Sequence, residues 1–172
     1  MSLTLLLSIL IFSFCGGCSD STSNDDLDEL GTVTFEVSGA LEGDKEGMAD
    51  FYSMSAYSLY TWEISTHDFN PQSFSLQFQR TSQSEIENPE PGTYSIGGGP
   101  DDYLAIFTDT EAGFADAVEY STFSEGTGGT LEITHSSDDL IRGTFSFTAS
   151  SEGGETVTIT NGQFEAKPRQ FD

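Results

Sequence analysis

The chain has 172 residues, and its 29 Asp and Glu against 5 Lys and Arg give a formal net charge of −24 at pH 7. A field of this sign repels nucleic acid and anionic lipid, so it argues against nucleic acid as a partner and favours a monomer. The acidity fits a solvated surface, adaptation to high salt, or a calcium site, although no acidic cluster has the ligand spacing of an EF-hand loop.

Residues 3–14 form an apolar segment near the start of the chain, LTLLLSILIFSF. As a helix, this segment would span about 18 Å, which is less than the roughly 30 Å of a bilayer's hydrocarbon core. Its length is that of the apolar region of a secretory signal peptide. We therefore predict that residues 1–17 are a signal helix that is removed by cleavage.

The next residues, Phe14-Cys15-Gly16-Gly17-Cys18, resemble a lipobox, in which small residues precede an acylated cysteine. The resemblance implies that Cys18 carries the lipid and becomes the first residue of the mature chain. Cys15 departs from the Leu that is usual at its position. Its removal with the signal peptide leaves a single cysteine, so no disulfide is expected within the chain.

Residues 18–31 are polar and acidic, which predicts a disordered tether. Acidic residues soon after the cysteine resemble the surface-display signal of Bacteroidota lipoproteins, and a soluble spacer explains them equally well. The signal, the cysteine and the tether together predict a protein anchored through lipid in the outer membrane of the cell envelope. The sequence leaves open whether it lies on the periplasmic face or at the cell surface.

From residue 32 onward the apolar pattern has a period of two, as in half-buried strands. The clearest example is Val33, Phe35 and Val37, and similar alternation occurs in residues 74–79, 141–148 and 156–160, with shorter candidates at 48–54, 94–97, 117–123 and 130–135. Many short strands separated by turns predict an all-β antiparallel β-sandwich over residues 32–168, with a small antiparallel barrel as the alternative. The helical competitor, residues 109–118, is weakened by Gly113.

Two finer predictions concern the C-terminal strands. Ile159 and Phe164 are five residues apart, so both can face the core only if Asn161 and Gly162 absorb a residue as a bulge or turn. Arg142 lies on the polar face of its strand, where we expect an exposed ion pair across the sheet with Glu132 or Glu165.

Two segments carry apolar residues on both strand faces, residues 57–64 and 103–107. A central strand that is covered on both sides, or a strand that passes a sandwich corner, explains this pattern. The alternative is a ligand-facing aromatic surface made by Tyr57, Tyr60 and Trp62, since Tyr and Trp combine apolar rings with a polar group.

Catalytic and metal-binding motifs are absent from the sequence. His67 and His135 are its only histidines, and we expect both to be exposed. No zinc motif, nucleophile elbow or phosphate-binding loop occurs, because residues 97–99 are followed by Pro-Asp-Asp and are expected to form a hairpin loop. We therefore predict a non-enzymatic domain without a cofactor, catalytic residue or metal site.

Four segments occur in an order that resembles a family of small Bacteroidota-type lipoproteins of unknown function. They are residues 91–94 (PGTY), 129–133 (GTLEI), 142–149 (RGTFSFTA) and 156–164 (TVTITNGQF). The resemblance covers residues 91–166 well and 32–90 loosely, and it implies a lipobox followed by a β domain. The predicted function is a binding or scaffolding domain for an unknown envelope protein. The alternative is a domain that binds a sugar or an apolar small molecule near Tyr57–Trp62.

Overall fold

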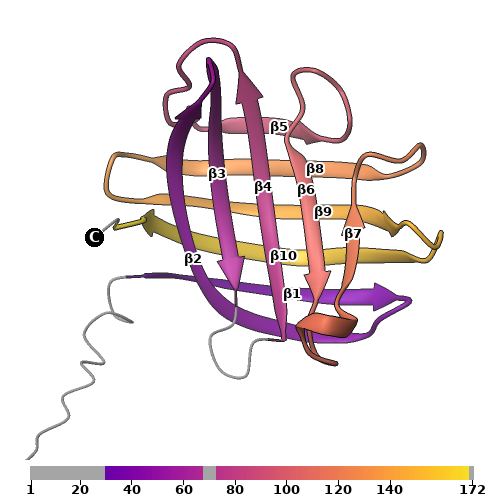
Figure 1. Cartoon of the computed structure of the whole chain (residues 1–172). Coiled ribbons are helices and arrows are strands. Elements are labelled where there is room, and N and C mark those ends of the chain that lie inside the picture. The colour runs from indigo at the N-terminus through magenta and orange to yellow at the C-terminus, as the bar shows by residue number, and fades with distance from the viewer. Residues whose placement is uncertain (1–29, 68–72, 171–172) are drawn as a thin grey trace, which may run out of the picture.

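The computed structural model describes residues 30–67 and 73–170 (Figure 1). The predicted signal peptide, the predicted lipid-bearing Cys18 and almost all of the predicted tether lie outside the described residues. The described elements are β1 (Gly31–Gly39), β2 (Gly43–Ala56), β3 (Leu59–His67), β4 (Phe74–Ser82), β5 (Gly92–Ile96), β6 (Leu104–Asp109), the 3₁₀ turn η1 (Phe114–Asp116), β7 (Val118–Ser121), β8 (Gly128–Ser136), β9 (Ile141–Ser151) and β10 (Thr156–Pro168).

Eight strands close into a hydrogen-bonded ring in the order β1-β2-β3-β4-β6-β7-β9-β10, and β10 returns to β1. Neighbours in this ring are antiparallel. The end of β10 also pairs in parallel with β2, through Lys167 with Asp50 and Pro168 with Phe51. The strands β8 and β5 extend the sheet outward from β9. The predicted all-β antiparallel class is confirmed. The closed ring corresponds to the small antiparallel barrel that the sequence analysis gave as the alternative.

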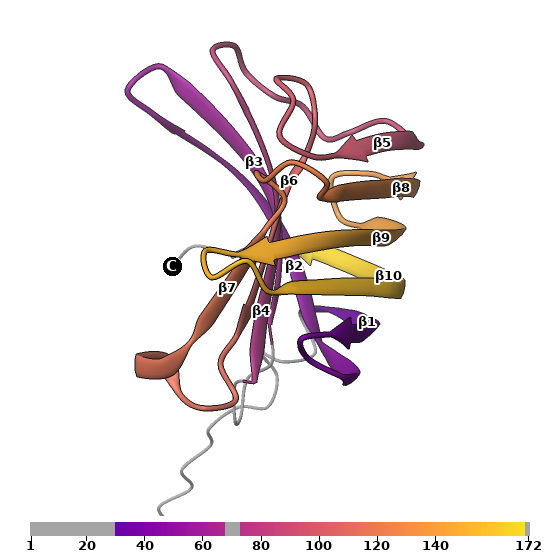
Figure 2. The ribbon, with the colours of Figure 1, turned by 90° about the vertical axis from the view of Figure 1, so that its right-hand side faces the viewer.

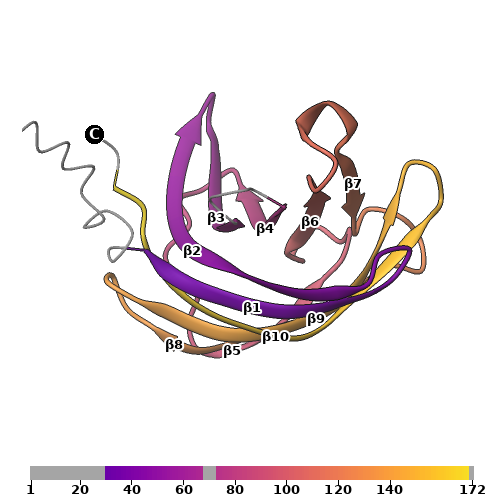
Figure 3. The same cartoon turned by 90° about the horizontal axis from the view of Figure 1, so that it is seen from below.

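The strands form two sets that cross each other, as Figures 1 and 2 show from two sides. The first set is β1, β10, β9, β8 and β5, and the second is β2, β3, β4, β6 and β7. Seen from below, the first set curves around the second (Figure 3). The long strand β2 belongs to both, because residues 43–49 pair with β1 and residues 48–56 pair with β3. Two crossed sheets that share such a strand make a barrel-like sandwich.

Alternation within each strand decides which side chains enter the core. In β1, Val33, Phe35 and Val37 are buried while Thr34 and Glu36 are exposed, as the period of two predicts. The same pattern recurs in β9 and β10. The sequence therefore specifies the inward face of the ring strand by strand.

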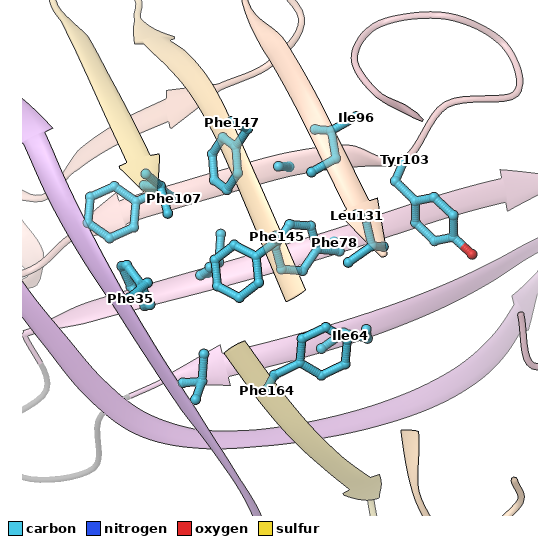
Figure 4. Packing of buried hydrophobic residues seen from close by; sticks show 14 of the residues in the cluster. Phe35, Ile64, Phe78, Ile96, Tyr103, Phe107, Leu131, Phe145, Phe147 and Phe164 are labelled. Carbon is cyan, nitrogen blue, oxygen red and sulfur yellow. The ribbon is translucent and has the colours of Figure 1, made fainter. Parts of the chain in front are cut away.

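Aromatic side chains fill the interior between the two sets of strands (Figure 4). The rings of Phe78 and Phe145 are 4.9 Å apart between centroids, and those of Phe35 and Phe74 are 5.1 Å apart, both edge to face. Each fully buried Phe stabilises the fold by about 1.5–3 kcal/mol through the hydrophobic effect. The barrel interior is thus a packed core.

The predicted irregularity in the last strand is confirmed. The pairing of β10 with β9 shifts register between Ile159 and Gly162, which lets both Ile159 and Phe164 face the core. The positive φ of 54° falls on Asn161. Gly162 is required for space, because a Cβ there would lie 2.4 Å from the ring of Phe145.

Two connections differ from the sequence-based expectation. Of the helical competitor at residues 109–118, only the single turn η1 forms. Residues 97–103 connect β5 to β6, which belong to different sets of strands. They are therefore not a hairpin loop between paired strands, and Ile96 and Tyr103 meet instead in an isolated parallel bridge.

Candidate binding surface

A two-residue turn, Tyr57-Ser58, joins β2 to β3 and projects from the end of the barrel (Figure 2). The sequence placed Tyr57 within the segment that continues as β3, whereas the structure places it in this turn. The φ angles are 52° at Tyr57 and 69° at Ser58, the signs of a type I′ turn. Such turns favour Asn-Gly, because a residue with a Cβ pays about 1–2 kcal/mol in the left-handed region. This hairpin therefore keeps a large side chain at a strained position.

The turn and the strands beside it expose three apolar side chains, which we call the tip surface. Tyr57 is fully exposed, Met54 is 51% exposed and Leu59 is 46% exposed. Met54 and Leu59 lie on the same strand face, because Ala56 pairs with Leu59 and Met54 with Thr61. Large apolar groups gathered in this way mark interaction sites more often than isolated ones do.

A groove of about 240 Å³ runs beside the tip surface. It is lined by Ser53, Met54, Ser55, Tyr60, Thr61, Glu85 and Ile86. Tyr60 is half-buried there, opposite Ser55 on β2. The groove brings Glu85 and Ile86 of the β4–β5 connection against the hairpin, so the tip and this connection form one continuous surface.

Trp62, the third predicted aromatic residue, is buried in the core. Its indole Nε1 donates a hydrogen bond to Oδ1 of Asn88 at 3.1 Å, and its ring packs edge to face on Tyr103 at 5.9 Å. Burial raises the pKa of Tyr103 to about 12. Trp62 therefore fixes the β4–β5 connection to the barrel.

The structure does not gather the three predicted aromatic residues on one face. Tyr57 points away from the turn, Tyr60 lines the groove, and Trp62 occupies the core. Tyr60 and Trp62 share a strand face but lie at different depths, and Tyr57 lies outside the pleat. Nothing in the sequence marks Met54 and Leu59 as surface residues, since apolar side chains in a strand are as expected at buried positions as at exposed ones.

Exposed acidic side chains lie at the same end of the barrel as the tip surface. The β2–β3 turn, the β4–β5 connection and the β5–β6 connection lie at the same end of the barrel (Figures 1 and 2). Within the two connections, the exposed acids are Glu85, Glu87, Glu90 and Asp101, which we call the acidic rim. Residues 47–67 and 81–103 contain no Lys or Arg. This end of the domain thus combines apolar contact area with negative charge.

Further from the turn, the outer face of the same hairpin, together with neighbouring segments, carries a polar group of residues, which we call the base cluster: Asp50, Tyr52, Glu63, Gln79 and Arg169. Asp50 and Glu63 are each only 3% exposed. Arg169 donates to both carboxylate oxygens of Asp50, at 3.0 and 2.7 Å, and lies 4.2 Å from the ring centroid of Tyr52. This bidentate pair holds the C-terminal end of the chain against β2.

Glu63 is the member of the base cluster whose hydrogen bonding is incomplete. Its Oε2 accepts a hydrogen bond from Nε2 of Gln79 at 3.0 Å, while its buried Oε1 has no hydrogen-bond partner within the described residues. Burial raises the pKa of Glu63 above its usual value, against the lowering effect of hydrogen bonds from Tyr52 and Gln79. Burial, with the neighbouring Glu63 carboxylate, also raises the pKa of Tyr52 to about 12.

The remaining predicted polar residues lie apart from the tip. His135 is exposed near the end of β8, as expected, and His67 is only partly exposed at the end of β3. Arg142 pairs with Glu165 at 2.7 Å across β9 and β10, which confirms the predicted ion pair and selects Glu165 over Glu132. In residues 30–67 and 73–170, no three His, Cys, Asp or Glu side chains are arranged to hold a metal ion.

No helix in the described part of the chain is long and apolar enough to cross a bilayer.

The strand order and the closed ring define the chain first as an all-β barrel domain. Residues 75–168 match the model of a domain family of unknown function, DUF6252. The match spans more than half of the 172 residues, so the chain belongs to this family. Comparison with characterised proteins and with solved structures gives no match. The matched residues begin in β4, so the tip surface lies outside them, whereas all four acids of the rim lie within them.

Proposed function

We propose that this protein is a lipid-anchored, non-enzymatic binding domain of the cell envelope that presents its β2–β3 hairpin to a partner protein. The observation that carries the proposal is the tip surface, where Met54, Tyr57 and Leu59 are exposed together at a strained turn. Strain of this kind persists where the surrounding structure enforces it, and it concentrates at functional sites.

The packed interior supports a binding mode that uses the outside of the barrel. Aromatic and aliphatic side chains fill the space between the two crossed sets of strands, as Figure 4 shows for Phe78 and Phe145. In ligand-carrying barrels, by contrast, the interior is left open for the ligand. A partner of this domain therefore has the outer faces and the connections available to it.

Anchoring at Cys18 is the second part of the proposal and rests on the sequence alone. Acylation at Cys18 would hold the domain at the outer membrane, and the acidic segment after it would act as a tether. Replacing Cys18 by Ser should abolish labelling with a radioactive or clickable fatty acid and leave the precursor unprocessed. Labelling that persists in the variant would contradict this attachment site.

The binding function can be tested by photo-crosslinking in the native envelope. A photoreactive phenylalanine at position 57 or 59 should capture the same partner, identified by mass spectrometry, and one at exposed Glu152 in the β9–β10 turn should not. Capture from position 59 should be lost when Met54→Ser and Tyr57→Ser are added. A chain that crosslinks equally from position 152, or from neither tip position, would refute the proposal.

A second candidate function, small-ligand binding, rests on the groove beside Tyr60. Its volume of about 240 Å³ lies below the roughly 300–1,000 Å³ of typical ligand pockets, so it fits a molecule of monosaccharide size. Titration with monosaccharides, followed by NMR shifts of the groove residues, tests this candidate. Saturable shifts that are lost in Tyr60→Ala would favour it over a protein partner.

A further inference from the structure

The tip surface and the acidic rim form one composite surface. Glu85 and Met54 line the same groove, so a carboxylate and an exposed apolar side chain flank one depression. Glu87 and Glu90 follow along the same connection, and Asp101 lies in the neighbouring one (Figure 1). All four rim acids are exposed. Glu85 therefore borders the tip directly, and the other three rim acids add negative charge at the same end of the barrel (Figure 1).

Within the described residues this charge has few local counterions. Residues 47–67 and 81–103 contain neither Lys nor Arg. The nearest base in sequence, Arg80, is partly exposed near the end of β4, where its side chain donates a hydrogen bond to the buried Tyr103. Complementary positive charge on a partner would steer its approach and suppress wrong partners.

Charge also distinguishes between the molecules that could bind this surface. A second copy of the chain carries the same −24 charge and the same rim, so two copies repel each other at this end. An anionic membrane is repelled for the same reason. A polypeptide with Lys or Arg beside an apolar side chain matches both the apolar centre and the acidic border, which is the usual layout of a protein interface.

We infer that the tip surface binds a cationic polypeptide segment, which packs an apolar or aromatic side chain against Met54, Tyr57 and Leu59 and places Lys or Arg against the acidic rim. This inference rests on the proposed binding function and adds the chemistry of the partner. The apolar contact supplies the adhesion, and the rim supplies orientation and selectivity.

Selection from a display library of random peptides against the full chain in detergent tests this chemistry. Enriched peptides should combine Lys or Arg with Leu, Phe, Tyr or Trp. Their affinity should fall at least tenfold for the double variant Tyr57→Ser, Leu59→Ser, and it should fall as salt is raised. Circular dichroism and fluorescence of the buried Trp62 report whether each variant remains folded.

A matched pair of charge variants isolates the rim. The triple variant Glu85→Gln, Glu87→Gln, Glu90→Gln removes three charges beside the tip and should weaken the selected peptides about tenfold. The control Glu119→Gln, Glu132→Gln, Glu152→Gln removes three exposed charges elsewhere and should change affinity less than twofold. Equal losses in the two triple variants would mean that net charge alone attracts the peptides, and the inference would fail.

Three other outcomes overturn the inference. They are enrichment of acidic or uncharged peptides, binding of the chain to phosphatidylglycerol vesicles through Tyr57, and a concentration-dependent dimer that Tyr57→Ser disrupts. These results are distinguishable from failure of the proposed function. A partner crosslinked at position 57 through a neutral or acidic surface would refute only the inferred partner chemistry. The absence of any crosslink at that position would refute both the inferred chemistry and the proposed binding function.

Discussion

The two ends of the β2–β3 hairpin distribute apolar and charged side chains in opposite ways. At the tip, Met54, Tyr57 and Leu59 are apolar and exposed, while at the base Asp50 and Glu63 are charged residues that are almost fully buried. Each arrangement is unfavourable by itself, because an exposed apolar patch promotes association and a buried carboxylate without hydrogen-bond or charge partners destabilises the fold. The base cluster has its partners in Arg169, Tyr52 and Gln79, whereas the three tip side chains remain exposed among the described residues.

The hairpin is therefore held by contacts at its base and middle, whereas the side chains at its tip are exposed. Arg169 and the end of β10 lie against β2 at the base, and Trp62 with Asn88 ties the middle of the hairpin to the barrel. Beyond Trp62 the two strands continue to the turn with mostly exposed residues. Changes at the base and middle should therefore affect stability, and changes at the tip should affect binding.

The largest expected effect is on the middle of the hairpin. Trp62→Ala removes a fully buried indole and its hydrogen bond to Asn88, and we expect it to lower the free energy of unfolding by about 3–5 kcal/mol. Tyr57→Ala, at the exposed tip, should stay within about 0.5 kcal/mol of the wild type. Urea denaturation measures both, and equal losses in the two variants would break the comparison.

The next effect concerns the ion pair at the base. Arg169→Ala leaves Asp50 buried without its bidentate partner, and we expect a loss of about 2 kcal/mol in unfolding free energy. Arg142→Ala breaks the exposed pair with Glu165 and should cost at most about 1 kcal/mol. Adding Asp50→Asn to Arg169→Ala should restore part of the loss. No recovery in that double variant would show that the arginine acts by packing on Tyr52 instead.

A third effect is a pH dependence that originates at Glu63. Burial raises its folded-state pKa above the usual 4.5, so the folded protein binds this proton more tightly than the unfolded chain does. The resulting stabilisation is complete below the usual pKa and is lost as the pH rises through the raised one. Glu63→Gln keeps a neutral group, so its unfolding free energy should improve relative to the wild type as the pH rises from below 4.5 through the raised pKa.

The exposed Glu132→Gln serves as the control, because it removes one surface carboxylate and leaves the base cluster intact. Chemical denaturation at a series of pH values gives both curves. A Glu63→Gln difference that is flat with pH would contradict a buried, proton-binding carboxylate at the base.

The smallest effect is expected at the turn. Replacing Tyr57-Ser58 by Asn-Gly puts preferred residues at the two positive φ angles, and we expect a gain of about 1 kcal/mol in unfolding free energy. The same variant removes the exposed ring and should abolish crosslinking from position 59. Higher stability with unchanged partner capture would show that Tyr57 serves the turn and not the partner.

Much of the strand framework was predictable because it depends on local alternation. The inward residues of β1, β9 and β10 follow a period of two, and parity alone located the bulge at Asn161 and Gly162. Arg142 is the one base on the polar face of its strand, and this position predicted the cross-sheet ion pair for which the structure selects Glu165 over Glu132. These features need no knowledge of distant parts of the chain.

The hairpin tip and its base were not predictable for two physical reasons. Tyr57-Ser58 lacks the Gly, Asn or Asp that usually marks a two-residue turn, so the strand seemed to continue through it. Burial of Asp50 and Glu63 depends partly on Arg169, which lies more than a hundred positions later in the chain. Contacts with residues so distant in the sequence do not affect the local pattern of apolar and polar residues.

The closed ring has a consequence for how the chain acquires its structure over time. The first described strand, β1, lies between β2 and the last strand, β10, with Thr32 opposite Glu165. The ring cannot close until β10 has been synthesised, since loop closure over such a separation must come before the pairing rewards it. Pairing of β1 with β10 is therefore a late step of folding, whereas β1 can pair with β2 as soon as the first hairpin exists.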